Sequence, residues 1–385
     1  MGWTGTESAE RKHVEEKRGM SRSLAVRKAV FTVAVVVTLA LIMIAALTDE
    51  WLLTAIAVGL AFGFAMQQGG FCGAAILSLV VLLEDRKGVV GAGIAISVAM
   101  AGFAVMSVLG VVTPNAKPLH LMPAIIGGLI FGAGMVLAGG CVSGSLFKAG
   151  EGRVPSMLAL VGIGIGTNMA GPGLFGPWRQ AVIGVTREVS AGPGLNDVLG
   201  LSYSSVAAVL GVVTFAVLVF VARRQGRGAS GASFFELIAT KGWSFAAAGL
   251  FIGVLGWLAY LSSAACGRNY PLGVTHGVMA LFSSVVGGQT EIRWWLALEV
   301  MAIVAGSSIS AWLRGGLKLR SADASTLLIS FLGGVLVGAG AVLAGGCFVG
   351  NILSGWALLS IHTLIFGVCV VIANWVTTIL YMRGV

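Results

Sequence analysis

The chain has 385 residues, of which 57% are hydrophobic and only 10% charged, against about 25% charged residues in soluble proteins, so the composition excludes a soluble enzyme or binding module. The net charge of +9 would suggest a nucleic-acid partner in a soluble chain, but these charges lie between apolar runs, where they set topology and contact lipid headgroups. The apolar runs are about 20 residues long, as bilayer-spanning helices require, and predict an all-α polytopic membrane protein rather than a barrel.

The N-terminal segment combines a charged arm with the first apolar run. Residues 9–28 are rich in Lys, Arg and Glu, and the apolar stretch Phe31–Leu47 follows. A signal peptide has the same order, but its charged region is shorter than this one. A signal peptide also has a small-residue cleavage site after its apolar region, and no such site is evident before Trp51. We therefore expect residues 1–50 to form a basic cytoplasmic arm and an extra, retained N-terminal helix.

Two apolar segments of the next region are interrupted by glycine. A glycine in a helix costs about 1 kcal/mol relative to alanine, so adjacent glycines favour a break. Non-helical backbone at membrane depth is tolerated only where it lines a cavity or is buried in protein. The predicted helical pairs are Ala55–Met66 with Gly73–Leu83, separated by residues 67–72, and Pro123–Ala138 with Val142–Phe147, separated by Gly139-Gly140-Cys141.

The second of these broken elements occurs again in the C-terminal part of the chain. Gly127–Cys141 returns at Gly333–Cys347 with 11 of 15 positions identical, and both copies end in Gly-Gly-Cys. Another break is expected at Ser262–Leu272, by analogy with residues 67–72. Helix packing alone explains many of the glycines, but it gives no reason to end both copies with cysteine.

The distribution of lysine and arginine predicts about ten crossings with both termini in the cytoplasm. On this topology the two Gly-Gly-Cys elements run in opposite directions, which makes the halves an inverted repeat with broken or re-entrant helices meeting near the membrane centre. The predicted divisions are residues 51–171 for the first half, 172–241 for an outer loop, a joining helix and a cytoplasmic linker, and 242–385 for the second half. The expected cytoplasmic loops are Glu84–Lys87, Lys148–Arg153, Arg223–Lys241 and Arg314–Arg320.

Four of the five cysteines, Cys72, Cys141, Cys266 and Cys347, fall at the predicted breaks, whereas Cys369 lies in an uninterrupted apolar run and is expected to be a small core residue. Disulfides are a poor interpretation at membrane depth. Four thiolates could bind zinc or an iron–sulfur cluster, but there is no C-x-x-C motif, so we expect neither a metal nor a cofactor.

Neutral thiols at such breaks are suited to an anion. Burial keeps a thiol protonated, and its S–H group can donate weakly to an anion without adding negative charge. The helical pieces that begin after Gly140 and Gly346 would direct positive helix ends and N–H groups at the same cavity. The residues therefore predict binding of an anion whose chemistry suits sulfur, without naming it.

The motifs Gly70–Cys72, Gly139–Gly152 and Gly345–Gly350 resemble those of the YeeE/YedE family of membrane sulfur transporters. The resemblance implies an hourglass-like helical fold and import of thiosulfate across the bacterial cytoplasmic membrane. It also implies that Cys72, Cys141 and Cys347 pass the ion along by S–H contacts. A separate TusA-like sulfurtransferase on the cytoplasmic side is the partner that the resemblance implies.

Several points stay open at this stage. The extra N-terminal helix and Cys266 are not explained by the resemblance, and Cys266 is either a fourth relay thiol or a small side chain. Arg268 either attracts a dianion into a vestibule or caps a loop. The cargo could be a selenium oxyanion, and a membrane thiol–disulfide oxidoreductase or a general anion channel is an alternative to the permease. No Walker A or nucleophile motif is evident, so we expect a transporter and no enzyme.

Other polar residues also have two interpretations. His276 and His362 either titrate in a proton-coupled mechanism or pack helices through hydrogen bonds. The loop residues Lys148, Glu151 and Arg153 either shape a cytoplasmic exit or form a solvated loop. Gln67 and Gln68 are expected to face protein or water, because unsatisfied amides are costly at membrane depth.

Overall fold

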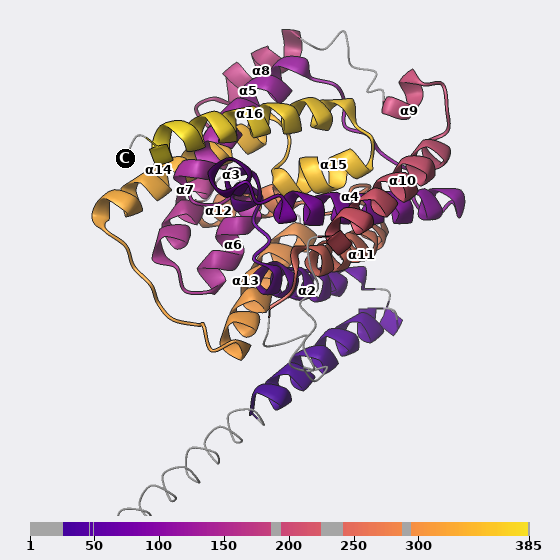
Figure 1. Ribbon diagram of the computed structural model, residues 1–385, viewed down its shortest axis with the longest axis horizontal. Helices are drawn as coiled ribbons and strands as arrows, with labels where there is room; N and C mark the ends of the chain where they lie inside the picture. The colour runs from indigo at the N-terminus through magenta and orange to yellow at the C-terminus, as the bar shows by residue number, and fades with distance from the viewer. Residues whose placement is uncertain are drawn as a thin grey trace, which may run out of the picture.

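The computed structural model describes residues 26–45, 47–48, 50–185, 194–224, 242–286 and 294–383, and within these ranges the regular elements are helices (Figure 1). The prediction of an all-α protein is confirmed. Residues 1–25 of the predicted basic arm and residues 225–241 of the predicted linker lie outside the described residues.

Nine helical segments of the described residues are long and apolar enough to cross a membrane, which confirms the polytopic class. The sequence predicted about ten crossings, and two further apolar helices, α7 and α12, are shorter than the rest. Three of the nine segments are broken helices, as expected. The nine are Val26–Ala45, Trp51–Leu83, Lys87–Val108, Leu121–Gly150, Tyr203–Ala222, Phe245–Ala265, Trp294–Leu313, Ala324–Ala357 and Ile361–Tyr381.

The two regions that contain the breaks have matching orders of elements. The first comprises η1 (Trp51–Leu53), α2 (Thr54–Gly69), α3 (Gly73–Leu83), α4 (Lys87–Val108), α5 (Leu121–Leu137), α6 (Val142–Gly150) and α7 (Val154–Ala170). Between the regions lie α8 (Gly176–Val185), α9 (Leu195–Val198) and α10 (Tyr203–Arg224). The second comprises α11 (Phe245–Ala265), α12 (Val274–Val286), α13 (Trp294–Leu313), α14 (Ala324–Leu343), η4 (Phe348–Leu353), α15 (Ser354–Ala357) and α16 (Ile361–Arg383).

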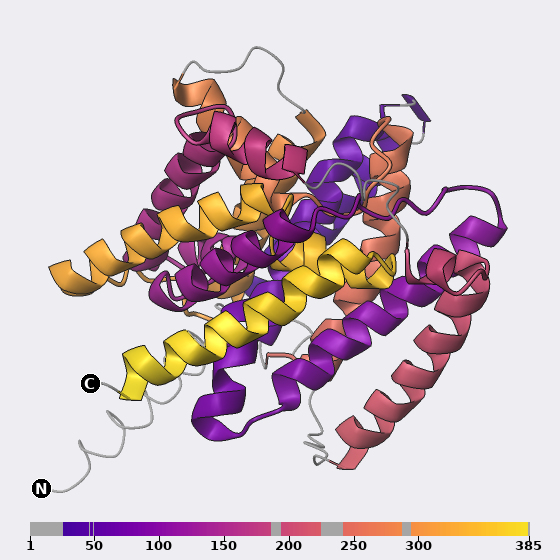
Figure 2. The same ribbon diagram turned by 90° about the horizontal axis from the view of Figure 1, so that it is seen from above.

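Helices of one region pack mainly on helices of the other. Helix α13 packs on α2 and α11 packs on α4, while α14 packs on α7 and α16 packs on α5 (Figures 1 and 2). Glycines permit these close approaches: a Cβ atom at Gly334 or Gly338 would collide with the backbone of α7, and one at Gly59 or Gly63 with the backbone of α13. The helices therefore interlock around a shared interior.

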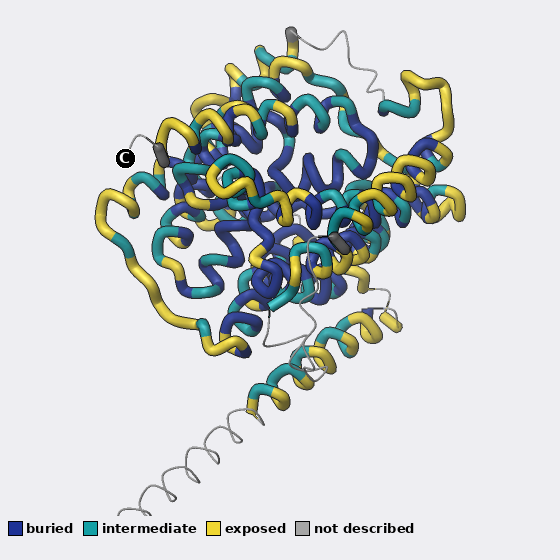
Figure 3. Tube along the Cα trace, in the orientation of Figure 1, coloured by how far each residue is buried: buried dark blue, intermediate teal, exposed yellow. Residues whose placement is uncertain are grey.

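The N-terminal helix and α10 lie at the periphery of this bundle. Only 6% of the apolar window of Val26–Ala45 and 17% of that of Tyr203–Ala222 is buried, compared with 50% or more in most other spans. Figure 3 shows both helices mainly exposed, with the buried residues concentrated where the broken helices meet. Apolar side chains on these two helices are consistent with a lipid-facing position.

Candidate functional site

Cys72, Cys141 and Cys347 occupy equivalent places in three broken helices. Each is the N-cap residue of the short helix that follows a break: Cys72 of α3, Cys141 of α6 and Cys347 of η4. Each break contains a glycine in the left-handed region, with φ values of 58° at Gly70, 66° at Gly139 and 69° at Gly345. Glycine accepts this conformation without a Cβ penalty, so it can end the first helix and turn the chain toward the second.

The first break is shorter than the sequence predicted. Helix α2 continues through Gln67 and Gln68 to Gly69, so that only residues 70–72 are non-helical. The side chain of Gln67 accepts a hydrogen bond from Ser310 at 2.6 Å, so the polar groups do not need to leave the helix. Both glutamines are buried and therefore face protein, one of the two surroundings expected for them.

The structure brings the three break cysteines into one buried cluster. None is more than 1% exposed. The thiols of Cys72 and Cys141 are neighbours beside the same glycine. A Cβ atom at Gly144 of α6 would lie 2.5 Å from the Cys72 sulfur and 3.4 Å from that of Cys141, so Gly144 leaves the space that both sulfurs fill. The ring of Phe348, next to Cys347, lies against Gly73, next to Cys72.

The sulfur of Cys141 also caps helix α6. It accepts a hydrogen bond from the backbone N–H of Gly144 at 3.4 Å and lies 3.4 Å from the hydroxyl oxygen of Ser143. We expected the N–H groups of this helix end to be directed at a cavity, but one of them is used by the thiol. Cys141 therefore has an electron-rich sulfur fixed at a positive helix end.

A cavity of about 750 Å³ reaches the third of these breaks. Gly346 and Cys347 line it, whereas Cys72 and Cys141 do not. Three cationic residues also line the cavity: Lys117 from the α4–α5 connection, Arg179 from α8 and Arg268 from the α11–α12 connection. The other side chains that contribute polar groups to the lining are Asn115, Asn269, Tyr270, Thr275, His276 and Ser283.

Lys117 is a site residue that the sequence analysis missed. Its Nζ donates to the carbonyl oxygen of Gly345 and to Oδ1 of Asn351, both at 2.6 Å, and lies 4.7 Å from the centre of the Tyr270 ring. Burial lowers the pKa of Lys117 to about 7, so this amine titrates near neutral pH. The available signal was a lone lysine in the otherwise uncharged stretch 109–120.

Arg268 both caps a loop and lines the cavity, so its two interpretations are not exclusive. One guanidinium nitrogen donates to the hydroxyl oxygen of Ser263 at 3.0 Å and to the carbonyl oxygens of Tyr270 at 3.0 Å and Pro271 at 2.5 Å. The guanidinium also lies 5.7 Å from the centre of the Trp295 ring. These contacts fix a positive charge in the cavity wall.

Cys266 and Cys369 lie apart from the other three cysteines. Cys266 is the C-cap residue of α11, packs beside Ala55 and Trp295, and does not line the cavity. Burial raises the pKa of the Cys266 thiol. Cys369 of α16 lies against Gly128 of α5, where a Cβ atom would come 2.8 Å from the cysteine Cβ, as expected of a small packing residue.

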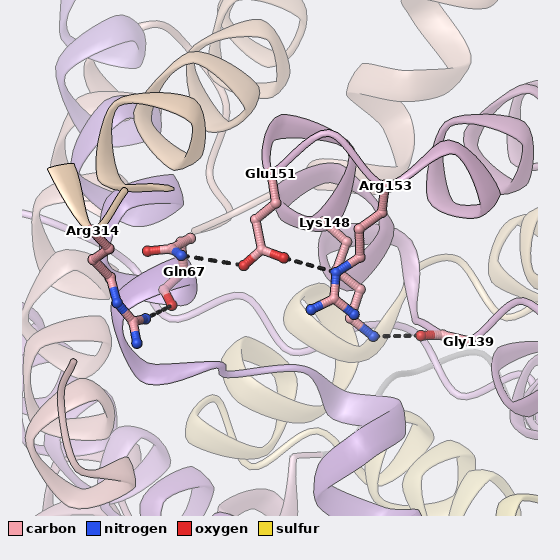
Figure 4. Close-up of polar contacts among 6 residues, drawn as sticks. All are labelled: Gln67, Gly139, Lys148, Glu151, Arg153 and Arg314. Atoms are coloured by element: carbon pink, nitrogen blue, oxygen red, sulfur yellow. Dashed lines mark hydrogen bonds and ion pairs between the residues drawn. The ribbon is translucent and has the colours of Figure 1, made fainter. Parts of the chain in front are cut away.

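The two Gly-Gly-Cys breaks share a lysine cap. Lys148 donates to the carbonyl oxygen of Gly139 at 2.5 Å (Figure 4). Lys117 donates in the same way to the carbonyl oxygen of Gly345 at 2.6 Å. In each case an ammonium group satisfies a carbonyl where the preceding helix ends, which is favourable for the helix dipole. The second residue of each pair differs in its surroundings: Gly140 packs on Ser145, and Gly346 faces the cavity beside Lys117.

Polar side chains form a connected group near Lys148. Glu151 accepts from Arg153 at 3.0 Å and from Gln67 at 3.3 Å, and Arg314 donates to the Gln67 carbonyl oxygen at 3.4 Å (Figure 4). These residues come from α2, the α6–α7 connection and the end of α13. They connect the two regions on the side of the three break cysteines where Lys148 lies.

His362 is a hydrogen-bonded packing residue, the second of its two interpretations. Its Nε2 lies 2.9 Å from the carbonyl oxygen of Ala344, and its Nδ1 accepts from the backbone N–H of His120 at 3.3 Å. Both ring nitrogens are therefore used at the end of α14. His276, in contrast, lines the cavity.

Comparisons with known proteins agree with this arrangement. The sequence profile of the sulphur transport family matches residues 68–376, a range that includes all three break cysteines. The thiosulfate transporter TsuA of Spirochaeta thermophila is 31% identical over 333 residues, which cover 84% of this chain and 96% of that protein. The thiosulfate transporter TsuA of Escherichia coli K12 is 30% identical over 346 residues, which cover 86% and 95%. The chain belongs to the sulphur transport family, and it is a multi-pass membrane protein.

Proposed function

We propose that this protein carries thiosulfate, or a similar inorganic sulfur anion, across the bacterial cytoplasmic membrane into the cell. The observation that carries the proposal is the cavity in which Lys117, Arg179 and Arg268 surround an approach to Cys347. Fixed cations raise the local concentration of a dianion, and the two relatives compared above are named thiosulfate transporters.

The three break cysteines are proposed as successive contacts for the anion. Cys347 meets it in the cavity, and the neighbouring thiols of Cys141 and Cys72 receive it beyond the Phe348–Gly73 contact. Neutral S–H groups donate weakly, so the anion can bind at each step and still leave, as conduction requires. Phe348 must move slightly for the anion to pass, because its ring fills the space beside Gly73.

The two halves, residues 51–171 and 242–385, are proposed to be inverted repeats. In the proposed repeat, α2 corresponds to α11, α4 to α13, α5 to α14 and α7 to α16. The packing of α2 on α13 then corresponds to the packing of α11 on α4, and the packing of α5 on α16 corresponds to that of α14 on α7. Such reciprocal packing is expected of two repeats related by a two-fold axis. The face that carries Lys148 and Glu151 is then cytoplasmic, where a TusA-like sulfurtransferase would receive the sulfur anion.

Uptake of radiolabelled thiosulfate by cells or proteoliposomes tests the proposal, with sulfate, sulfite and selenite as competitors. Uptake should require the protein and should be reduced most by unlabelled thiosulfate. Cys141→Ala and Cys347→Ala should abolish uptake while the protein remains folded and inserted in the membrane. Full uptake by both variants would exclude the relay, and stronger competition by selenite would favour a selenium oxyanion as cargo.

One observation favours a second function, that of a membrane thiol–disulfide oxidoreductase. The thiols of Cys72 and Cys141 are neighbours, and a redox enzyme needs two cysteines close enough to bridge. Trapping a mixed disulfide between Cys72 or Cys141 and a partner protein would support this function. Thiosulfate uptake without any such adduct would leave transport as the function.

A further inference from the structure

Helix α13 contains one titratable side chain, Glu299, which is completely buried in the first third of the candidate span Trp294–Leu313. One carboxyl oxygen, Oε2, accepts a long hydrogen bond of 3.4 Å from the backbone N–H of Gly273. The other, Oε1, has no hydrogen-bond partner among the described residues. A buried charged group that is only partly hydrogen-bonded is costly, so packing does not explain a glutamate at this position.

Glu299 lies directly behind the wall of the cationic cavity. Its hydrogen-bond donor Gly273 lines that cavity, as does Leu296, one helical turn before Glu299. A Cβ atom at Gly273 would come 2.5 Å from a guanidinium nitrogen of Arg268, so the guanidinium lies against the same glycine. The charge of Arg268 therefore acts both on the cavity and on the carboxyl group of Glu299.

The order of elements gives Glu299 a further significance in the proposed repeat. Gly273 immediately precedes α12, just as Cys72 immediately precedes α3. The second-half counterpart of Cys72 is therefore Gly273 rather than Cys266. Where the first half has a thiol, the second half has a glycine whose N–H group holds a carboxyl group.

The elements packed on α13 contribute few other titratable groups. Helix α2 and η1 have none, α12 contributes His276 on the cavity wall, and α6 contributes Lys148, which is bound to the Gly139 carbonyl oxygen. Lys117, across the cavity, acts electrostatically on Arg268. Arg268 is thus the charged group with the most direct influence on Glu299, and an anion in the cavity would compete for it.

We propose that Glu299 is a proton-binding site coupled to anion binding in the cavity. In the empty cavity the ionised carboxylate balances the charge of Arg268. A dianion that enters becomes the counter-ion of Arg268 and repels the carboxylate, which then binds a proton taken up from the bulk solution, forming an O–H bond at Oε1. Coupling is reciprocal, so acid tightens anion binding as much as the anion tightens proton binding.

This inference rests on the proposed function only in taking the anion to be thiosulfate. The experiment adds thiosulfate to purified protein in weakly buffered detergent solution and records proton uptake with a pH indicator. Thiosulfate affinity is measured in parallel by calorimetry from about pH 8 to about pH 6. We expect proton uptake on binding and a Kd that decreases as the pH is lowered, by at most about tenfold per pH unit for each of two linked protons, those of Glu299 and Lys117.

Substitutions identify the residue that binds the proton. Glu299→Gln keeps an acceptor for the Gly273 N–H group but cannot ionise, so it should bind more tightly than the unmodified protein at about pH 8 and take up fewer protons, with only the uptake by Lys117 remaining. Lys117→Arg should lose the proton uptake of Lys117 but retain that of Glu299, because arginine stays protonated and leaves Glu299 intact. Asp323→Asn, the same change at the exposed N-cap of α14, should behave like the unmodified protein.

Each outcome has one meaning. Proton uptake that is undiminished in Glu299→Gln, or that disappears entirely in Lys117→Arg, would overturn the assignment. Thiosulfate binding with no pH dependence and no proton uptake in the unmodified protein would overturn the coupling itself. Absence of thiosulfate binding would refute the proposed function instead. If Glu299→Gln aggregates, Glu299→Asp should keep proton uptake but with a shifted pH dependence, and an unshifted dependence would overturn the assignment.

Discussion

Lys117 should make thiosulfate affinity depend on pH, and substitution by arginine should remove this part of the dependence. Because burial lowers the pKa of Lys117 to about 7, this amine is about 90% protonated at about pH 6 and about 10% protonated at about pH 8. Protonation adds the positive charge that a dianion needs, so affinity rises as pH falls. If only the protonated form binds, the KM for uptake rises about tenfold over this interval.

The assay is initial-rate thiosulfate uptake into proteoliposomes with the same pH on both sides of the membrane. Lys117→Arg keeps a cation at every pH, so the change in its KM between about pH 6 and about pH 8 should be roughly tenfold smaller than in the unmodified protein. Lys117→Met removes the charge and should raise KM at about pH 6 by roughly tenfold to a hundredfold, the usual effect of losing a charged hydrogen-bond partner.

A surface control separates this effect from the general effect of pH on the protein. Lys318→Arg changes an exposed lysine in the α13–α14 connection and should leave the pH dependence of KM intact. Any dependence that remains in Lys117→Arg is expected to come from Glu299. The reasoning is refuted if Lys117→Arg retains the full pH dependence, or if Lys117→Met transports with an unchanged KM at about pH 6.

Three further predictions concern packing, the cysteines and topology. Gly73→Ala places a methyl group 2.5 Å from the Phe348 ring and should destabilise the protein by about 1–3 kcal/mol, measured by thermal unfolding; Phe348→Leu should restore part of the loss, and Gly184→Ala, with nothing within 4 Å, should be neutral. Cys266→Ala should retain most thiosulfate uptake, and complete loss would show that this cysteine belongs to the pathway. A cysteine introduced at exposed Lys318 should react with an impermeant maleimide only from the cytoplasm, and one at exposed Leu174 only from outside; the opposite pattern would invert the topology.

Composition and segment length are enough to predict the class of this protein, and paired glycines are enough to predict its breaks. Uninterrupted apolar residues in a bilayer have only the helix available to satisfy their backbone groups, so composition and length were sufficient for the all-α prediction. Gly139 and Gly345 marked two breaks correctly, since glycine adopts the left-handed conformation at a helix end without a Cβ penalty. The extent of the first break was wrong because Gln67, although polar, finds Ser310 as a partner and stays helical.

Only the tertiary structure decided which polar residues share a site. Lys117 lies 228 residues from the glycine carbonyl that it caps, and Glu299 lies 26 residues from the glycine that binds it. Neither pairing follows a helical or strand period, so no local pattern in the sequence predicts it. The same reason explains why the sequence left two interpretations of Cys266 open: only the packing of helices shows that it lies beside Ala55 and Trp295, apart from the three break cysteines.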